Sequence, residues 1–268
     1  MADVGRLTNP YGQGFNYSEV LGRLRSEFSS SHGPLFHYTD HAASTGLRNG
    51  QLWMTRADCF LDATEIAYGL DLFRVSARTD LDERERALFN EVLAILRARL
   101  QSCFFWSLSQ DPDSEHLRHK YATDGEPPLR FSPGFPITLR AAWHIRPADG
   151  LPHKVHFVVD HYDFFEGFVV YDDARQRRLA AMACQAFQDF LRADAHGVDR
   201  FLFVQVLMEC LVLFKSRRFG PEGEHRIALV HKPDSAESFE ETRDSRGRRF
   251  VYITVGFPKS SGPDRQRA

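Results

Sequence analysis

Three short polar signatures lie within otherwise apolar runs, and their side chains are of types that can do chemistry. A histidine can exchange a proton or donate a hydrogen bond, a hydroxyl can hold a carboxylate in place, and a carboxylate can stabilise a developing positive charge. The signatures are Leu35-Phe36-His37-Tyr38-Thr39, Phe104-Phe105-Trp106-Ser107-Leu108-Ser109, and Phe214-Lys215 followed by Phe219-Gly220-Pro221-Glu222-Gly223-Glu224-His225-Arg226-Ile227. Because they are spread over nearly the whole chain, they predict one site assembled from distant strands.

His37 has two interpretations that the residues alone leave open. It lies in an apolar segment, beside Tyr38 and Thr39. A lone histidine on a strand often belongs to the core, where a backbone carbonyl satisfies it. The alternative is that His37 donates a hydrogen bond to a hydroxyl or carbonyl of a ligand.

The serines and glutamates of the other two signatures are each spaced two residues apart. In extended chain this spacing puts Ser107 and Ser109 on one face, and likewise Glu222 and Glu224. The plainer interpretations are the solvent side of a half-buried strand for the serines and a charged loop for the glutamates. If Glu224 lies on a glycine-flanked loop with few core contacts, its substitution should leave folding nearly unaffected.

In order and spacing, the three signatures resemble the ADP-ribosyltransferase superfamily. The resemblance implies NAD as cofactor and a macromolecular acceptor, either protein or nucleic acid. It implies that Glu224 stabilises the charge on the ribose as nicotinamide leaves, while Glu222 serves the acceptor. The catalytic residues would be Glu224, Glu222 and His37, and the residues contacting NAD would be His37, Tyr38, Thr39, Ser107, Ser109 and Arg226. The chain combines features of two classes of that superfamily: a histidine at the first position is usual in one, and Ser-x-Ser with Glu-x-Glu is usual in the other. No particular acceptor is therefore indicated.

A second resemblance is to a family of uncharacterised bacterial proteins. Its motifs match His37-Tyr38-Thr39, Phe60-Leu61-Asp62-Ala63-Thr64-Glu65, Cys103-Phe104 with Ser107 and Ser109, His119-Lys120-Tyr121-Ala122, and Phe214-Lys215 with Phe219, Glu222, Glu224 and Arg226. The chain departs from that pattern at Leu61 and Ala63, and at Phe219 where tryptophan is usual. This resemblance bears on fold more than on function.

Other charged or metal-binding side chains have ordinary explanations beside the functional ones. Arg217 and Arg218 with Arg226 could bind pyrophosphate or a nucleic-acid backbone, and a solvated cationic helix end is an equal alternative. Two groups of histidines lack the ligand spacing of a metal site, so we expect no metal. These groups are His116 with His119, and His153 with His156 and His161.

Composition indicates a soluble protein of the cytoplasm. The 268 residues carry a net charge of -2, so there is no global electrostatic footprint for nucleic acid, although a local basic patch is not excluded. The four cysteines are scattered, which predicts reduced and mostly buried thiols. We expect no signal peptide and no membrane segment, because the longest apolar run, 201–214, is too short to span a bilayer.

Helical and strand patterns interleave without regular alternation, which predicts an α+β fold. Together with the resemblance, this indicates an ADP-ribosyltransferase-like split mixed or antiparallel sheet flanked by helices. We expect a flexible arm at 1–16, a single α+β domain at 17–257 and a disordered tail at 258–268. The expected helices lie near 18–28, 40–49, 62–75, 81–100, 114–122, 173–195 and 199–215. The expected strands lie near 35–38, 52–54, 103–108, 137–143, 154–159, 167–171, 225–231 and 249–256, with loop at 125–136 and an exposed hairpin around 240–249.

The sequence therefore predicts a NAD-dependent ADP-ribosyltransferase or NAD glycohydrolase acting on a macromolecular acceptor. By analogy alone, such an activity would suit a bacterial toxin or a phage-defence effector. Two alternatives remain open: a non-catalytic nucleotide- or RNA-binding module on the same fold, and a nuclease-type toxin using His37, Glu224 and Arg226 as acid, base and phosphate clamp.

Overall fold

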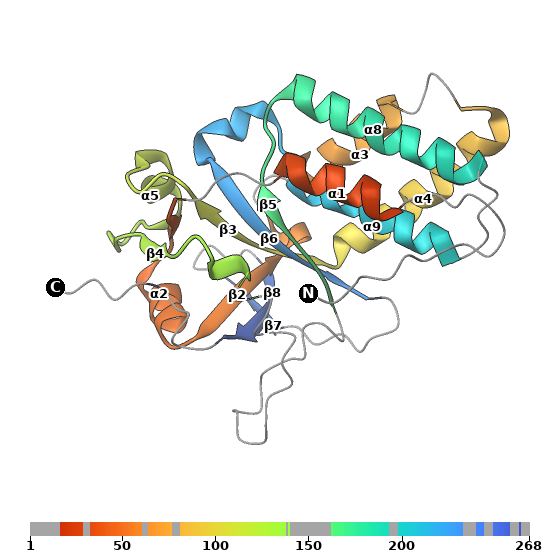
Figure 1. Ribbon diagram of the computed structural model, residues 1–268. Coiled ribbons are helices and arrows are strands. Elements are labelled where there is room, and N and C mark those ends of the chain that lie inside the picture. The colour runs from red at the N-terminus through yellow and green to blue at the C-terminus, as the bar shows by residue number, and fades with distance from the viewer. Residues whose placement is uncertain are drawn as a thin grey trace.

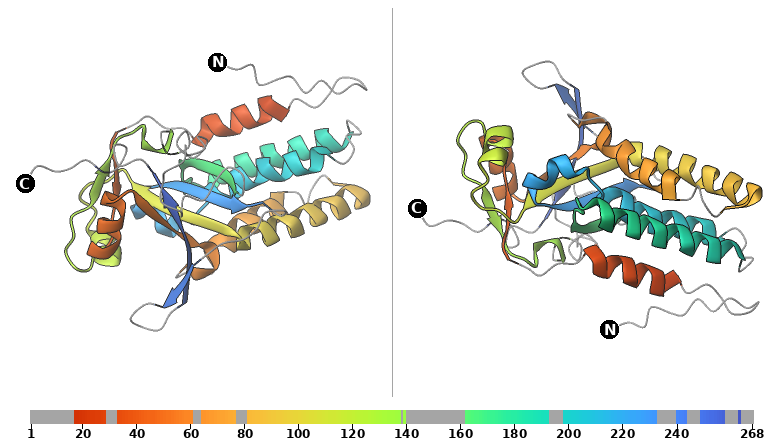
Figure 2. Two further views of the ribbon diagram at one scale, coloured as in Figure 1. Left: turned by 90° about the horizontal axis from the view of Figure 1, so that it is seen from below. Right: turned by 90° about the horizontal axis from the view of Figure 1, so that it is seen from above.

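An antiparallel sheet runs through the protein, and most of the helices gather at one end of it (Figures 1 and 2). The computed structural model describes residues 17–28, 33–60, 64–76, 81–137, 139, 162–192, 198–232, 240–243, 249–257 and 263. The helices are α1 (Tyr17–Phe28), α2 (His41–Arg48), α3 (Thr64–Ser76), α4 (Glu83–Gln101), α5 (Glu115–Tyr121), α8 (Asp173–Arg192) and α9 (Val198–Leu213), with 3-10 helices η1 (Ala57–Cys59) and η2 (Arg217–Glu222). The strands are β1 (Leu35–His37), β2 (Gln51–Arg56), β3 (Cys103–Ser109), β4 (Leu129–Phe131), β5 (Tyr162–Phe168), β6 (Glu224–His231), β7 (Glu240–Arg243) and β8 (Arg249–Gly256).

Strand β3 is the point at which the sheet divides. Along one edge it pairs with β6 over its whole length, from Cys103 opposite Val230 to Ser109 opposite Glu224. Its other edge is shared: β2 pairs near Phe105, and β1 pairs at Ser109. No described strand pairs with residues 106–108 on that edge, so the sheet splits there. The eight strands pair antiparallel throughout, and with the helices they confirm the predicted α+β class.

The two faces of the sheet carry separate hydrophobic cores, because alternate residues of a strand point to opposite sides. One core joins the helices α1, α3, α4, α8 and α9 to the face of the sheet that carries Phe105 and Ala228. The other lies on the face that carries Trp106 and Ile227, with β2, β8 and residues 129–139. All four cysteines are buried free thiols, as the sequence predicted.

Several helix starts follow from capping residues that the sequence shows. The Asp40 carboxylate accepts a hydrogen bond from the Ala43 N–H at the start of α2. Asp82 and Glu85 form a reciprocal capping box at the start of α4, and Ser114 caps α5. Each side chain satisfies an amide that the first helical turn leaves without a partner, so these boundaries are fixed locally.

Other expectations were wrong or fall outside the described residues. The loop expected at 125–136 contains strand β4, because Leu129 and Phe131 bury while Arg130 faces solvent, and β1 offers them an edge. Ile137 and Leu139 are helical rather than the start of a strand. The strand expected at 167–171 lies earlier, at β5, and β7 with β8 forms the expected hairpin pairing. The described residues do not include the first two positions of the helix expected near 62–75, the strand expected at 154–159, the arm at 1–16, or any of the tail except Pro263.

Helix α9 is the centre of the helical core, since it contacts α1, α3, α4 and α8 and the strands β5 and β6. Leu207 on this helix has no exposed surface. We expect Leu207→Ala to lower the free energy of unfolding by about 2–5 kcal/mol, because the removed methyl groups leave a cavity in a packed core. Urea unfolding measures this change. Ile95→Ala, at a position 47% exposed on α4, is the matched control, and we expect it to stay within about 0.5 kcal/mol of the parent. Equal losses in the two variants would contradict the central place of α9.

Candidate functional site

The ends of β3 and β6 bring the predicted serines and glutamates face to face. In the register of the two strands, Ser107 lies opposite Arg226 and Ser109 lies opposite Glu224. These four side chains share the face of the sheet that further along carries Phe105 and Ala228 of the helical core. The polar site therefore begins where the helical core ends, and the sequence spacing of the serines did predict their common face.

Six charged side chains form one network at this place, which we name the ion cluster. Its members are Glu65, Lys120, Lys215, Glu222, Glu224 and Arg226. All except Lys120 are buried, and three carboxylates meet three cations, so the charges within the cluster cancel. Burying a charge is unfavourable unless it is paired and hydrogen-bonded, and this arrangement meets both conditions.

Lysine and arginine hold the glutamates from two sides. The Lys215 ammonium lies 2.6 Å from Glu222 Oε2 and 2.9 Å from Glu224 Oε2. Arg226 donates from Nε to Glu224 Oε1 at 2.6 Å and from Nη2 to Glu65 Oε1 at 2.5 Å. Both cations therefore fix the orientation of the Glu224 carboxylate.

Lys215 reaches the cluster because the chain after α9 is held by its backbone. Its N–H donates to the carbonyl of Val170, and its own carbonyl accepts from the amide of Gln176 at 2.8 Å. The segment that ends α9 is thereby tied to the chain between β5 and α8. Lys215 directly follows a long apolar run within the third polar signature, and a charge in that position is a sequence signal that could have assigned it to the site.

Glu224 is an ionised carboxylate in a buried position. Its side chain accepts from the Ser107 hydroxyl at 2.5 Å in addition to Arg226 and Lys215. Burial alone would raise the pKa of Glu224, but the charges of Arg226 and Lys215 and these hydrogen bonds outweigh burial and hold that pKa well below its usual range. The expectation that Glu224 lies on a loop with few contacts was wrong, because the residue begins β6 and is 3% exposed.

Ser107 is an exposed hydrogen-bond partner of the buried Glu224 carboxylate. The serine is exposed, although the carboxylate bonded to it is buried. It also lies where the sheet splits, in the stretch of β3 that has no described strand partner on one edge. A ligand that displaces the Ser107 hydroxyl would therefore contact Glu224 directly.

Ser109 has a different task from Ser107. Its hydroxyl donates to the carbonyl of Glu222 at 3.0 Å and accepts from the N–H of Asp111 at 3.1 Å. It thereby holds the turn that separates the two glutamates. Gly223 in this turn has a φ of 50°, a left-handed conformation that favours glycine. Glu222 and Glu224 therefore both meet Lys215 although this turn lies between them.

His37 touches the site through the backbone of Ser107. Its Nδ1–H donates to the Ser107 carbonyl at 2.8 Å, and the Trp106 indole N–H donates to its Nε2 at 3.2 Å. Burial lowers the pKa of His37 to about 4, so the ring is neutral at pH 7. Both ring nitrogens have partners within the protein, which matches the interpretation of a histidine satisfied by a carbonyl. The NAD contact and the catalytic role of His37 stay predictions.

We expect the neutral state of His37 to make stability depend on pH. The unfolded chain binds a proton near pH 6.5, whereas the folded ring binds one only near pH 4. Between these values the unfolded state holds more protons, so stability falls as the pH falls from about 6.5 to about 4. A His37→Gln variant does not titrate and should lose less stability across this window. Melting temperatures at half-unit pH steps measure this dependence. If the melting temperature changes equally with pH in the parent and in the variant, His37 is not the cause.

Tyr38 and Thr39 do not join the ion cluster. The Tyr38 hydroxyl donates to the Asp111 carbonyl at 2.6 Å and accepts from the Ser114 N–H at 3.0 Å, so it ties β1 to the start of α5. Thr39 is half-buried in the same segment. Their contact with NAD stays a prediction.

Arg226 occupies a place that differs from the one expected for it. Its donors bond to Glu224, to Glu65 and to the carbonyl of Val212, and the residue is 2% exposed. A buried guanidinium with these partners does not present itself to a pyrophosphate or to a nucleic-acid backbone. The geometry gives Arg226 the task of positioning Glu224, and it does not support a cofactor contact or the phosphate clamp of a nuclease.

Sequence reasoning did not assign three members of the ion cluster to the site. Glu65 and Lys120 were noted only as matches to the second resemblance, and Lys215 was noted there and in the third polar signature without a role of its own. In the structure they meet Glu222, Glu224 and Arg226, which belong to the last motif of the same resemblance. Motifs far apart in the chain thus converge on one place.

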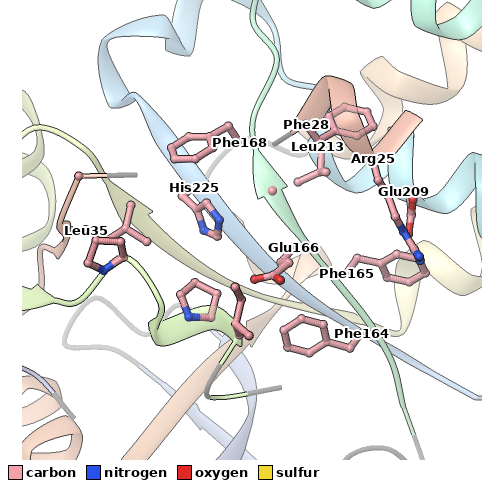
Figure 3. A pocket seen from close by; sticks show the side chains of 15 residues that line it. Arg25, Phe28, Leu35, Phe164, Phe165, Glu166, Phe168, Glu209, Leu213 and His225 are labelled. Atoms are coloured by element: carbon pink, nitrogen blue, oxygen red, sulfur yellow. The ribbon is translucent and has the colours of Figure 1, made fainter. Parts of the chain in front are cut away.

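A cavity of about 270 Å³ lies elsewhere, beside β5 (Figure 3). Glu166 and His225 point toward it, with Phe164 and Phe168 at its sides and the ion pair of Arg25 and Glu209 at its rim. None of the predicted site residues lines this cavity. Within β5 and β6, Glu166 and His225 belong to the face opposite Glu224 and Arg226.

Comparisons of the chain with protein-family models, with curated proteins and with solved structures find no match. Among the described residues, no group of three or more His, Cys, Asp or Glu side chains is placed to hold a metal ion. Within the same residues, no helix has the length and apolar character needed to cross a membrane. Ser107 and the ion cluster are therefore the features from which a function can be inferred.

Proposed function

We propose that the protein has an ADP-ribosyltransferase-like fold and cleaves NAD at Glu224, transferring ADP-ribose to a macromolecule or to water. One observation carries the proposal: an ionised, buried Glu224 is hydrogen-bonded to an exposed Ser107 at the split of the sheet. The location of the split, between the β1 and β2 pairings of β3, supports the resemblance in fold.

The chemistry needs a fixed negative charge beside a cationic ribose. When the bond from ribose C1′ to nicotinamide breaks, the electron pair leaves with nicotinamide and positive charge develops on the sugar. A carboxylate held rigidly beside C1′ lowers the energy of that state, as in glycoside hydrolysis. Arg226 and Lys215 hold Glu224 in one orientation, so little reorganisation is needed during the reaction.

Glu222 would serve the acceptor only after a change in its contacts. One of its oxygens lies 2.7 Å from Lys120 and the other 2.6 Å from Lys215. The Lys120 side chain is partly exposed and the Lys215 side chain is buried, so Lys120 is the partner that can move away from Glu222. Transfer to an acceptor therefore requires movement of Lys120, whereas hydrolysis by water does not.

Release of nicotinamide from NAD by the purified 268-residue chain tests the proposal. We expect release that rises in proportion to protein concentration. Binding of NAD without release would support the non-catalytic module instead. If the protein neither binds nor cleaves NAD, the proposed function is wrong.

A further inference from the structure

Tyr171 lies beside Glu224, although none of the sequence motifs includes it. It belongs to a short piece of chain, residues 169–171, that leaves β5 on the way to α8. We refer to residues 169–171 as the connecting segment. Val169 and Val170 in this segment are buried, and Tyr171 is half-buried. The segment is therefore part of the packed interior next to the ion cluster.

Both polar groups of the Glu224 backbone are held by the connecting segment. The Val169 N–H donates to the Glu224 carbonyl at 2.9 Å. In a regular hydrogen-bonded pair of antiparallel strands, the Glu224 N–H would return a bond to the Val169 carbonyl. Here the Glu224 N–H donates to the Tyr171 hydroxyl at 3.1 Å. A side chain thus takes the place of the backbone acceptor at the first residue of β6.

The connecting segment also holds the chain that carries Lys215. The Val170 N–H donates to the Leu213 carbonyl at 2.8 Å, and the Val170 carbonyl accepts from the Lys215 N–H at 3.3 Å. The segment is therefore bonded to the start of β6 and to the end of α9. The Glu224 carboxylate and the Lys215 ammonium, 2.9 Å apart, extend from backbones that this one segment keeps in place.

The Tyr171 hydroxyl is neutral and lies near the charge of Glu224. Burial, and after it the negative charge of Glu224, raise the pKa of Tyr171 above its usual value. The hydroxyl therefore keeps its proton at pH 7 and adds no charge to the ion cluster, whose three carboxylates and three cations already balance. Tyr171 thus contributes a hydrogen bond to the site and leaves its charge balance unchanged.

The position of a carboxylate depends on the backbone that carries it. The side-chain partners of Glu224 hold its carboxylate directly, whereas Tyr171 holds the residue at its amide. Accurate placement matters beside a reacting carbon, since a misplacement of about 1 Å can slow a reaction about 10²-fold. We propose that Tyr171 is a positioning residue for the Glu224 carboxylate. Its effect on catalysis rests on the proposed function, whereas its hold on the Glu224 amide does not.

Amide hydrogen exchange, followed by NMR in the absence of NAD, tests the hold on the amide. Tyr171→Phe removes one oxygen and leaves the Glu224 N–H without its acceptor, so we expect this amide to exchange about tenfold faster than in the parent. Tyr38→Phe is the matched control, because the Tyr38 hydroxyl also accepts from a backbone amide, that of Ser114. It should speed the exchange of Ser114 and leave that of Glu224 unchanged. Equal exchange of the Glu224 amide in the parent and in Tyr171→Phe would overturn the inference.

Nicotinamide release tests the effect of Tyr171 on catalysis. We expect Tyr171→Phe to lower kcat about tenfold and to leave KM within about twofold of the parent, because the hydroxyl holds Glu224 and is not proposed to contact NAD. Tyr252→Phe removes a hydroxyl that donates to Glu240, outside the ion cluster, and should keep the parent rate. Melting temperatures confirm that the variants fold. A Tyr171→Phe variant with the kcat of the parent would show that the hydroxyl does not position the carboxylate.

A double variant separates positioning from a general loss of structure. If Tyr171 acts through the charge of Glu224, its hydroxyl should matter little once that charge is removed. In the Glu224→Gln background we therefore expect Tyr171→Phe to slow release by less than about twofold. An equal loss of rate in both backgrounds would mean that Tyr171 acts on the fold as a whole, and the inference would be wrong.

The parent protein separates this inference from the proposed function. If the parent releases no nicotinamide, the proposed function is wrong, and the exchange rates alone decide whether Tyr171 holds Glu224. If the parent releases nicotinamide and Tyr171→Phe changes the exchange of the Glu224 amide without changing kcat, the cleavage of NAD stands and the positioning role fails.

Discussion

A Glu224→Gln variant is expected to release nicotinamide from NAD about 10²–10³-fold more slowly than the parent. The substitution keeps the shape of the side chain and its acceptance from Ser107, but it removes the negative charge that would face the ribosyl cation. Loss of one positioned electrostatic partner of a transition state typically slows a reaction by this factor. Nicotinamide release at saturating NAD measures the change.

Folding has to be separated from chemistry in this experiment, because Glu224 is part of the ion cluster. Glu224→Gln leaves Arg226 and Lys215 with one carboxylate fewer, so the variant should also be less stable. Assays well below its melting temperature remove this effect. Glu65→Gln is the matched control: it removes one charge from the same cluster at a residue that does not bond to Ser107. We expect it to keep activity within about tenfold of the parent. A Glu224→Gln variant that turns over NAD at the parent rate would show that the catalytic assignment is wrong.

The local part of the site could be predicted from the sequence. The spacing of two residues correctly predicted that Ser107 and Ser109 lie on one face of β3. The strand expected at 225–231 was also correct to within one residue, since β6 begins at Glu224. The caps at Asp40 and Asp82 fixed the starts of α2 and α4. In each case the interacting groups are within four residues of one another, so the physics is contained in a short window of sequence.

The rest of the site depends on contacts that no short window contains. Glu65 and Arg226 are separated by 161 positions, yet their side chains meet in the ion cluster. The inward direction of Arg226 follows from the register of β6 against β3, which is a property of the assembled sheet. For the same reason Glu224 looked like a loop residue beside glycines, when its surroundings are buried cations. A charged side chain can be buried only if a partner of opposite charge lies beside it, and the sequence does not show which distant residue that partner is.

The largest effect on stability is expected from Arg226→Met. This change removes a guanidinium that is 2% exposed and leaves Glu65 and Glu224 facing each other with only Lys215 between them. Removing one partner of a buried ion network typically lowers the free energy of unfolding by about 3–5 kcal/mol, which is a large part of the 5–15 kcal/mol that holds a typical domain folded. Urea unfolding of the purified variants measures this loss.

Charge balance provides the control for that prediction. In Arg226→Met/Glu65→Gln one cation and one carboxylate are removed together, so two of each remain. The double variant should therefore recover part of the lost stability, because neighbouring residues in one network do not act additively. Arg23→Met, which breaks the exposed ion pair with Glu19, should change stability by no more than about 1 kcal/mol. The contrary result is that Glu65→Gln lowers the free energy of unfolding by the same amount in the Arg226→Met variant as in the parent. Arg226 would then stabilise the fold by packing and not by balancing the buried carboxylates.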